Sequence, residues 1–284
     1  MKTYYDCIPC FIRQALEASR FATSDENIHE KVLRKVLLAV SDMDFSSSPP
    51  EMAQFIHRII RKLLKNDDPY REVKEKYNLF ALELYPELKK RIKRSSNPME
   101  TAVRLAIAGN IIDFGVFGDL KHEAVEDAIK NSLTDKFFGD IDKLFNEIFS
   151  AKKILYLGDN TGEIVMDRLL IEQMPMDRVT FVVRGGPVIN DATIKDAQRT
   201  GMTDLVHVID NGSDAPGTIL KDCSDILKKH FHEADLVIAK GQGNYETLSE
   251  VHKNICFLLK AKCHVIARHI GCEVGSLVVG NTGR

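Results

Sequence analysis

The sequence predicts an α/β protein, with a Rossmann-like three-layer α/β/α domain and a mostly parallel sheet preceded by an all-helical N-terminal domain. Residues 1 to about 150 place apolar residues at helical spacing and show no strand-like alternation. From residue 151 onward, short runs rich in β-branched residues alternate with helical patterns. That alternation is typical of parallel strands with helices on both faces of the sheet. We therefore expect two domains, residues 1–150 and residues 151–284.

The N-terminal half contains five segments with helical periodicity. A Ser-Pro-rich stretch precedes the third segment, Asn66-Asp67-Asp68-Pro69 follows it, and Asn97-Pro98 opens the fifth. These residues favour turns and helix starts, so they separate the helices. The expected helices cover residues 10–19, 29–40, 51–63, 70–93 and 99–111.

The C-terminal half contains short apolar runs that end in glycine or polar residues, which is the pattern of buried strands. The first run, Ile154–Leu157, leads into a helical pattern at residues 164–173. The expected strands are residues 154–157, 179–183, 205–209, 236–239, 265–267 and 277–279.

Composition argues against several classes of protein. The chain has 284 residues, of which 44% are hydrophobic and 28% charged, and its net charge of −2 gives no general attraction to nucleic acid or to an anionic membrane. The N-terminus lacks the apolar segment of a signal peptide, and no apolar run approaches the length of a membrane span. We expect a cytoplasmic monomer or homodimer without nucleic-acid or membrane partners, and reduced cysteines.

Polar residues follow four of the expected strands. Each cluster alone fits a helix cap or a turn, but parallel strands would bring all four clusters to one edge of the sheet, where such folds bind ligands. Carboxylates, amides, cations and free backbone N–H groups together suit a metal and a phosphate. The clusters are Gly158-Asp159-Asn160-Thr161-Gly162-Glu163, Arg184 to Asp191 with Asn190, Asp210 to Thr218, and Lys240 to Glu246 with Asn244.

Two further features are weaker. Cys7-Ile8-Pro9-Cys10 supplies half of a zinc site, for which Cys263 and Cys272 are the candidate further ligands, while inert thiols at a helix start are the alternative. The two histidines of His230-Phe231-His232-Glu233 lie at an expected helix end, where they complement the helix dipole.

The order and spacing of the clusters resemble those of the metal-dependent damage-control phosphatases, formerly a domain of unknown function. The resemblance rests on Gly-Asp-Asn-x-Gly-Glu, Arg-Gly-x-Pro-x-x-Asn-Asp, Asp-Asn-Gly-Ser-Asp-x-Pro-Gly-Thr and Lys-Gly-x-Gly-Asn-x-Glu. It extends to Asp6-Cys-Ile-Pro-Cys10, to Ala108-Gly-Asn110-Ile-Ile-Asp113 and to Leu258-Leu-Lys-Ala-Lys-Cys263. Stand-alone archaeal and bacterial members carry such an N-terminal CxxC.

The resemblance implies a role for each matching residue. Asp159, Asn160 and Asp191 would hold a divalent cation, Mn²⁺, Ni²⁺, Co²⁺ or Mg²⁺, and Lys240 would bind the phosphate. Asn110 and Asp113 would close the site from the helical half. The remaining residues that would line or support it are Arg184, Asn190, Asn244 and Glu246, with backbone N–H groups at the helix start after Gly162.

These residues predict hydrolysis of a small phosphorylated metabolite, such as a sugar phosphate. Metal-bound water is the favoured nucleophile, and direct attack by Asp159 is the alternative. An S-adenosylmethionine-dependent methyltransferase is a rival, because Gly241-Gln242-Gly243 is a partial glycine fingerprint. A non-catalytic protein that binds a metal or an anion is the second rival.

Overall fold

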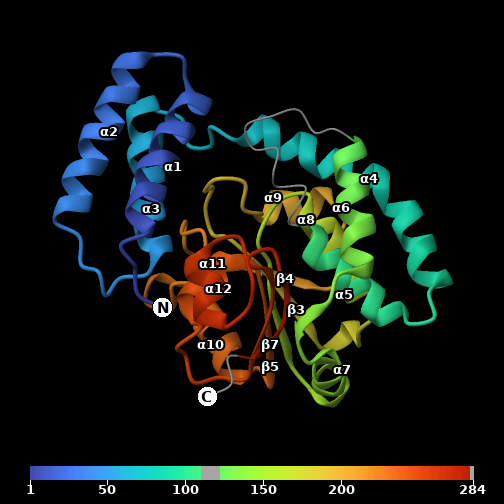
Figure 1. The fold of residues 1–284 in the computed structure, drawn as a ribbon. Coiled ribbons are helices and arrows are strands. Elements are labelled where there is room, and N and C mark those ends of the chain that lie inside the picture. Colours follow the sequence, from blue (N-terminus) through green and yellow to red (C-terminus); the bar gives the residue numbers. More distant parts are fainter. Residues whose placement is uncertain (110–121, 282–284) are drawn as a thin grey trace.

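A single mixed sheet forms the centre of the molecule (Figure 1). The computed structural model describes residues 1–109 and 122–281. Within them, seven strands pair in the order β1-β7-β6-β5-β2-β3-β4, and every neighbouring pair is parallel except β6 with β7. The strands are β1 (Phe137–Gly139), β2 (Ile154–Leu157), β3 (Val179–Val183), β4 (His207–Asp210), β5 (Leu236–Lys240), β6 (Ile255–Lys260) and β7 (Leu277–Asn281).

Helices cover both faces of this sheet, which confirms the three-layer α/β/α prediction and the helical segment before it. The N-terminal helices are α1 (Cys7–Ala22), α2 (Glu26–Ser41), α3 (Pro49–Leu64), α4 (Arg71–Arg94) and α5 (Pro98–Ala108). The later ones are α6 (His122–Thr134), α7 (Ile141–Ser150), α8 (Glu163–Ile171), α9 (Ile194–Arg199), α10 (Asp225–Glu233), α11 (Gly241–Leu248) and α12 (His264–Ile270).

The alternation of side chains along each strand separates two hydrophobic cores. Ile154 and Tyr156 of β2 pack with α4 to α9 on one face, whereas Leu155 and Leu157 pack with α10, α11 and α12 on the other. The first of these cores contains residues from both sides of position 150, so α4 and α5 form part of a sheet layer. The boundary between two domains at residue 150 stays a prediction.

Helices α1, α2 and α3 form a third core of their own beside the sheet (Figure 1). Polar contacts fix α3 to the loops at the carboxyl ends of the strands. Asp214, in the loop after β4, accepts hydrogen bonds from Gln54, Arg58 and Arg61 of α3, and Arg61 also donates to the Pro187 carbonyl oxygen at 2.5 Å. The three-helix unit therefore stands over the edge of the sheet where the polar clusters were expected.

The sequence predictions were wrong at two strands. Residues 265–267 lie in helix α12, and the strand in this region is β6, ten residues earlier. The β-branched Val265 and Ile266 favour a strand locally, but Ile266 is buried in the second core together with Ile270, one helical turn later, which packs against it. The N-terminal half also contains a strand, β1, which is too short to show a period and is defined by its pairing with β7.

None of the helices in the described part of the chain combines the length and the apolar character needed to cross a bilayer.

Candidate active site

The loops after β2 and β3 are joined by backbone hydrogen bonds, which places their polar residues together. The Thr161 N–H donates to the Asn190 carbonyl oxygen at 2.8 Å, and the Ala192 N–H donates to that of Asp159 at 2.8 Å. Asn160 and Asp191 form an isolated antiparallel bridge. The predicted metal ligands Asp159, Asn160 and Asp191 are thus neighbours at the carboxyl edge of the sheet.

Arg184, at the end of β3, links the two carboxylates. Its Nε donates to Asp191 Oδ2 at 2.6 Å, and its Nη2 lies 3.3 Å from Asp159 Oδ1. The guanidinium is 1% exposed, so its charge is not screened by water. It offsets part of the repulsion between the carboxylates and holds them in place when no other cation lies between them.

Asn244, in α11, connects the ends of the central strands. Its Nδ2 donates to the carbonyl oxygens of Gly158 and Lys240, at 3.1 and 2.8 Å, and its Oδ1 accepts from Thr218 Oγ1 at 2.8 Å. The side chain is fully buried. Asn244 therefore supports the loop that carries Asp159, and its role in a substrate site stays a prediction.

Gly241 makes room for Asp159 at the point where β5 turns into α11. Its φ is +77°, in the left-handed region that favours glycine, and a Cβ added there would meet Asp159 Oδ2 at 1.8 Å. Strands β2 and β5 are adjacent, and the chain leaves them toward opposite edges of the sheet. Asp159 and Gly241 thus lie at the topological switch point, where open α/β sheets bind ligands.

Lys240 is completely buried and does not lie among the described residues that line the cavity. Its Nζ donates to Glu163 Oε1 at 2.6 Å, to Asp167 Oδ1 at 2.5 Å and to the Ala106 carbonyl oxygen at 2.8 Å. Burial lowers the pKa of the amine, but the charges of Asp167 and Glu163 outweigh it and raise that pKa, so Lys240 stays protonated. Its phosphate-binding role stays a prediction, and the geometry favours a supporting role.

The carboxylates beside Lys240 connect this buried group to the candidate metal site. Burial raises the pKa of Asp167 to about 6, although Lys240 opposes the shift, and Tyr156 donates to Asp167 at 2.7 Å. Glu163 Oε2 accepts from Asn160 Nδ2 at 3.2 Å, and that Nδ2 also lies 2.9 Å from Asp159 Oδ2. The amide nitrogen of Asn160 is thereby fixed by two carboxylates, which leaves its oxygen as the atom able to face a cation.

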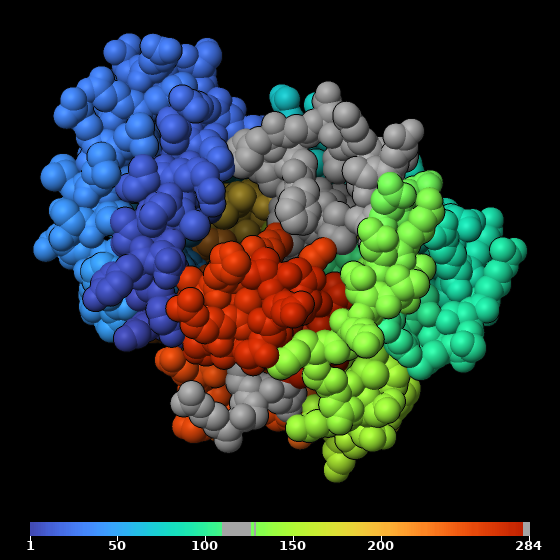
Figure 2. Space-filling view, in the orientation of Figure 1, coloured from blue at the N-terminus to red at the C-terminus, as the bar shows by residue number. Residues whose placement is uncertain are grey.

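A cavity of about 720 Å³ lies between the sheet edge and the N-terminal helices. Figure 2 shows it as a hollow between the blue helices and the red C-terminal segment. Asp159, Asn160, Asn190 and Asp191 line one part of it, and Glu246 another. Burial raises the pKa of Glu246 to about 7, so this carboxyl group titrates close to neutral pH.

Several predicted site residues lie behind the cavity surface. Arg184 and Asn244 support the loops as described, and the Gly162 N–H donates to Asn78 Oδ1 at 2.9 Å. That contact engages the N–H of Gly162, the residue directly before the helix start that was expected to face a phosphate. Asn110 and Asp113 lie outside the described residues.

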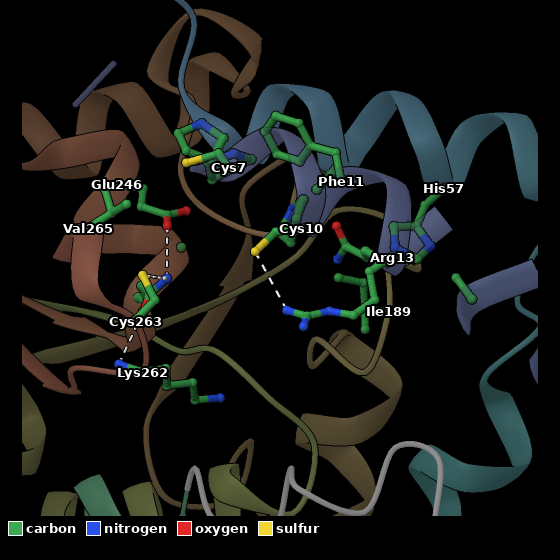
Figure 3. Close-up of a pocket in the computed structure, with 18 of the residues that line it drawn as sticks. Cys7, Cys10, Phe11, Arg13, His57, Ile189, Glu246, Lys262, Cys263 and Val265 are labelled. Carbon is green, nitrogen blue, oxygen red and sulfur yellow. Dashed lines mark hydrogen bonds between the residues drawn. The ribbon is translucent and has the colours of Figure 1, made fainter. Parts of the chain in front are cut away.

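Helices α1 and α3 contribute a wall of the cavity that was not predicted from the sequence (Figure 3). His57 of α3 is 2% exposed, and its Nε2 has no hydrogen-bond partner among the described residues. Burial, with a smaller effect of the Arg61 charge, lowers its pKa to about 3, so the imidazole is neutral in the physiological range. No sequence signal placed α1 and α3 at the sheet edge, because their contacts with it are non-local.

The residues at the sheet edge fit a hard divalent cation. Two carboxylates and an amide oxygen are ligands that Mg²⁺ or Mn²⁺ accepts, with water and substrate oxygens completing the coordination. Among the residues that the structure describes, no three His, Cys, Asp or Glu side chains cluster so as to hold a metal ion. Within the described part of the chain, an ion here would thus depend on Asn160 as well as on the two carboxylates.

Comparison with known proteins places this chain in a family. Residues 3–278 match the damage-control phosphatase ARMT1-like domain. The chain belongs to this family. The damage-control phosphatase PH1575 of Pyrococcus horikoshii is 38% identical over 98% of this chain and 97% of its own. A damage-control phosphatase of Archaeoglobus fulgidus is 36% identical over 96% of each chain.

The family also accounts for the fold. The crystal structure of the DUF89 family protein PH1575 superposes with a TM-score of 0.91 at 36% identity, covering both chains completely. The uncharacterized protein MJ0202 of Methanocaldococcus jannaschii is 37% identical over 96% of this chain and 93% of its own. The resemblance predicted from the motifs is confirmed, and the relatives support a phosphatase role.

Proposed function

We propose that this protein is a metal-dependent phosphatase that hydrolyses small phosphomonoesters, such as sugar phosphates or damaged phosphometabolites. One observation carries the proposal: Asp159, Asn160 and Asp191 converge on one wall of a cavity at the topological switch point of the sheet. The damage-control phosphatases among its relatives point to the same reaction.

Asp159, Asn160 and Asp191 would hold the cation, which would supply a Lewis acid for the phosphoryl oxygens. Mn²⁺, Ni²⁺, Co²⁺ and Mg²⁺ all suit these ligands. Arg184 keeps the two carboxylates apart and oriented, and Glu163 keeps the Asn160 amide from rotating. The protein thus provides an arrangement fixed before substrate binds, which lowers the cost of organising the transition state.

Water is the favoured nucleophile, with direct attack by Asp159 as the alternative. Both oxygens of Asp159 accept hydrogen bonds, Oδ1 from Arg184 and Oδ2 from Asn160. A carboxylate held at both oxygens is better placed to bind a cation than to approach phosphorus. Acid quenching during turnover separates the two: direct attack leaves a phosphoryl group bound to the Asp159 carboxylate, which hydroxylamine removes, whereas attack by water leaves the protein unphosphorylated.

The size of the cavity supports a metabolite rather than a macromolecule as substrate. At about 720 Å³ it lies within the range of small-molecule sites, and its lining mixes charged side chains with apolar ones such as Phe11 and Ile189. The body of the substrate would extend from the sheet edge toward α1 and α3. A cytoplasmic location and a monomeric or homodimeric state stay predictions from the sequence.

The test is hydrolysis of para-nitrophenyl phosphate by metal-stripped protein, with Mg²⁺, Mn²⁺, Co²⁺ and Ni²⁺ added back singly. We expect at least one metal to restore activity in the wild type and in a matched control, Asp225→Asn, whose carboxylate is fully exposed. Asp159→Asn and Asp191→Asn should each lose about 100-fold or more in kcat/KM, the scale expected for misplaced catalytic groups.

Three results would redirect the proposal. Undiminished metal-dependent activity in Asp159→Asn would show that the catalytic site lies elsewhere in the protein. Tight Mn²⁺ binding by calorimetry, without turnover of any phosphoester in a substrate screen, would support a non-catalytic binding protein. Metal-independent binding of S-adenosylmethionine would support the methyltransferase instead.

A further inference from the structure

Three cysteine thiols from two distant parts of the sequence line the same cavity. Cys7 and Cys10 come from the first turns of α1, and Cys263 is the residue before α12 (Figure 3). Cys272, the other cysteine considered for a metal site, is not among the described residues that line it. The thiols form no disulfide in this structure.

Cys10 and Cys7 differ in their surroundings. Cys10 is exposed, and Arg13 donates a hydrogen bond from Nη2 to its sulfur at 3.6 Å. Cys7 is half-buried, and its pKa is raised by burial, with smaller contributions from Glu246, Cys263 and Cys10. An accessible thiol next to a cation, beside a second and more protected thiol, is the arrangement of a reactive cysteine with a resolving partner.

The helix start allows these two thiols to approach each other. Residues three apart on a helix have Cβ atoms roughly 5–6 Å apart, and a disulfide needs about 3.5–4.5 Å, so the first turn must tighten by about 1–2 Å. Backbone N–H groups in a first turn have no intrahelical acceptor, and Pro9 has no N–H to lose. The Asp6 side chain makes no capping hydrogen bond that would resist the movement.

We propose that Cys10 is a modification site for hydroperoxides, with Cys7 as the resolving thiol. The Cys10 thiolate attacks one oxygen of hydrogen peroxide, the O–O bond breaks, and Cys10 sulfenic acid forms as hydroxide leaves and takes up a proton. The Cys7 sulfur then attacks the Cys10 sulfur, the S–O bond breaks, and a second water leaves. Two thiols are oxidised to one disulfide while one peroxide is reduced to two waters.

The full-length reduced protein is treated with one equivalent of hydrogen peroxide, quenched with N-ethylmaleimide and digested with trypsin. Peptide 3–13 contains both Cys7 and Cys10, whereas Cys263 lies in peptide 263–268. We expect peptide 3–13 to lose two hydrogens and to escape alkylation, and dithiothreitol to reverse the change. The measurement is covalent, so it succeeds or fails independently of the proposed phosphatase activity.

Variants identify the role of each thiol. Cys7→Ser should leave a sulfenic acid on Cys10 that dimedone traps, and Cys272→Ser should behave as the wild type. In a separate rate measurement, Cys10 should react with iodoacetamide at least about tenfold faster than Cys223, whose pKa burial raises to about 11.

Three outcomes would overturn the assignment. Equal rates for Cys10 and Cys223 would show that Cys10 is not selectively reactive. A cross-link between peptides 3–13 and 263–268 would make Cys263 the resolving thiol. A disulfide that still forms in Cys10→Ser would show that peroxide reacts elsewhere.

Discussion

Replacing Gly241 by alanine should inactivate the proposed site by moving Asp159 rather than by unfolding the protein. The added Cβ would lie 1.8 Å from Asp159 Oδ2 and 2.4 Å from its Cγ, whereas ordinary contacts begin at 3.4 Å. The carboxylate would therefore have to retreat by 1.6 Å, the difference between 3.4 and 1.8 Å. Arg184 and Asn160 already hold it on its other sides, so the retreat would disturb both contacts.

Two effects combine in this variant, and their sizes can be separated. A non-glycine residue at the φ of +77° costs roughly 1–2 kcal/mol in backbone strain. A displacement of about 1 Å in a catalytic group typically costs about 100-fold in rate. Gly271 is the matched control, because its φ is +86° and no described heavy atom lies within 4 Å of an added Cβ.

Urea denaturation and metal-dependent phosphatase assays on both variants decide the matter. We expect similar losses in the free energy of unfolding, but a fall of about 100-fold or more in kcat/KM in Gly241→Ala alone. Activity within about threefold of the wild type in Gly241→Ala would refute the reasoning, because Asp159 would then tolerate the displacement or play no part.

Three further predictions concern stability. His57→Leu should reduce the pH dependence of the free energy of unfolding. The native imidazole has a pKa of about 3 and stays neutral, whereas the same group in the unfolded chain binds a proton below pH 6.5. Through this group the free energy of unfolding of the wild type should fall by about 2 kcal/mol between pH 7 and pH 5. Replacing the exposed His252 by leucine should leave that decrease unchanged. Lys240→Met should lower the free energy of unfolding, measured by urea denaturation, by about 3–5 kcal/mol, because Glu163 and Asp167 would remain buried without their cation. A decrease below about 1 kcal/mol would show that these ion pairs contribute little to stability. Asp214→Ala should lower the free energy of unfolding by about 1–3 kcal/mol, because it removes the carboxylate that accepts hydrogen bonds from Gln54 and Arg58 of α3. An unchanged melting temperature would show that apolar packing alone holds this helix in place.

The fold was predictable where local pattern and tertiary environment agree. Strand β2 is a continuous buried run ended by a glycine, and β3, buried except at Thr180, is ended by a charged residue; the predicted bounds of both are those observed. The failures are the segments that depend on distant partners. β1 exists as a strand only through pairing with β7, some 140 residues later.

The sequence was sufficient to predict which loops would lie near one another at the candidate site. It was not sufficient to predict which of their side chains would point into the cavity. The bridge between Asn160 and Asp191 joins the loops after β2 and β3, two of the four that were expected to converge. The direction of the Lys240 side chain does follow from the sequence, because strand alternation places it on the same face as Leu236 and Ile238, away from the loop ends. Asp167 follows Glu163 by four residues on α8, so both carboxylates face that lysine.

The two walls of the cavity belong to different hydrophobic cores. The sheet-edge loops rest on the central cores, whereas α1 and α3 have their own core and meet the loops through polar contacts such as those of Asp214. Substitutions in separate cores combine almost additively. A directed-evolution library at Gln14, Ala53 and His57 could therefore vary substrate preference while leaving the reaction chemistry intact, so selectivity and turnover could be optimised in separate rounds.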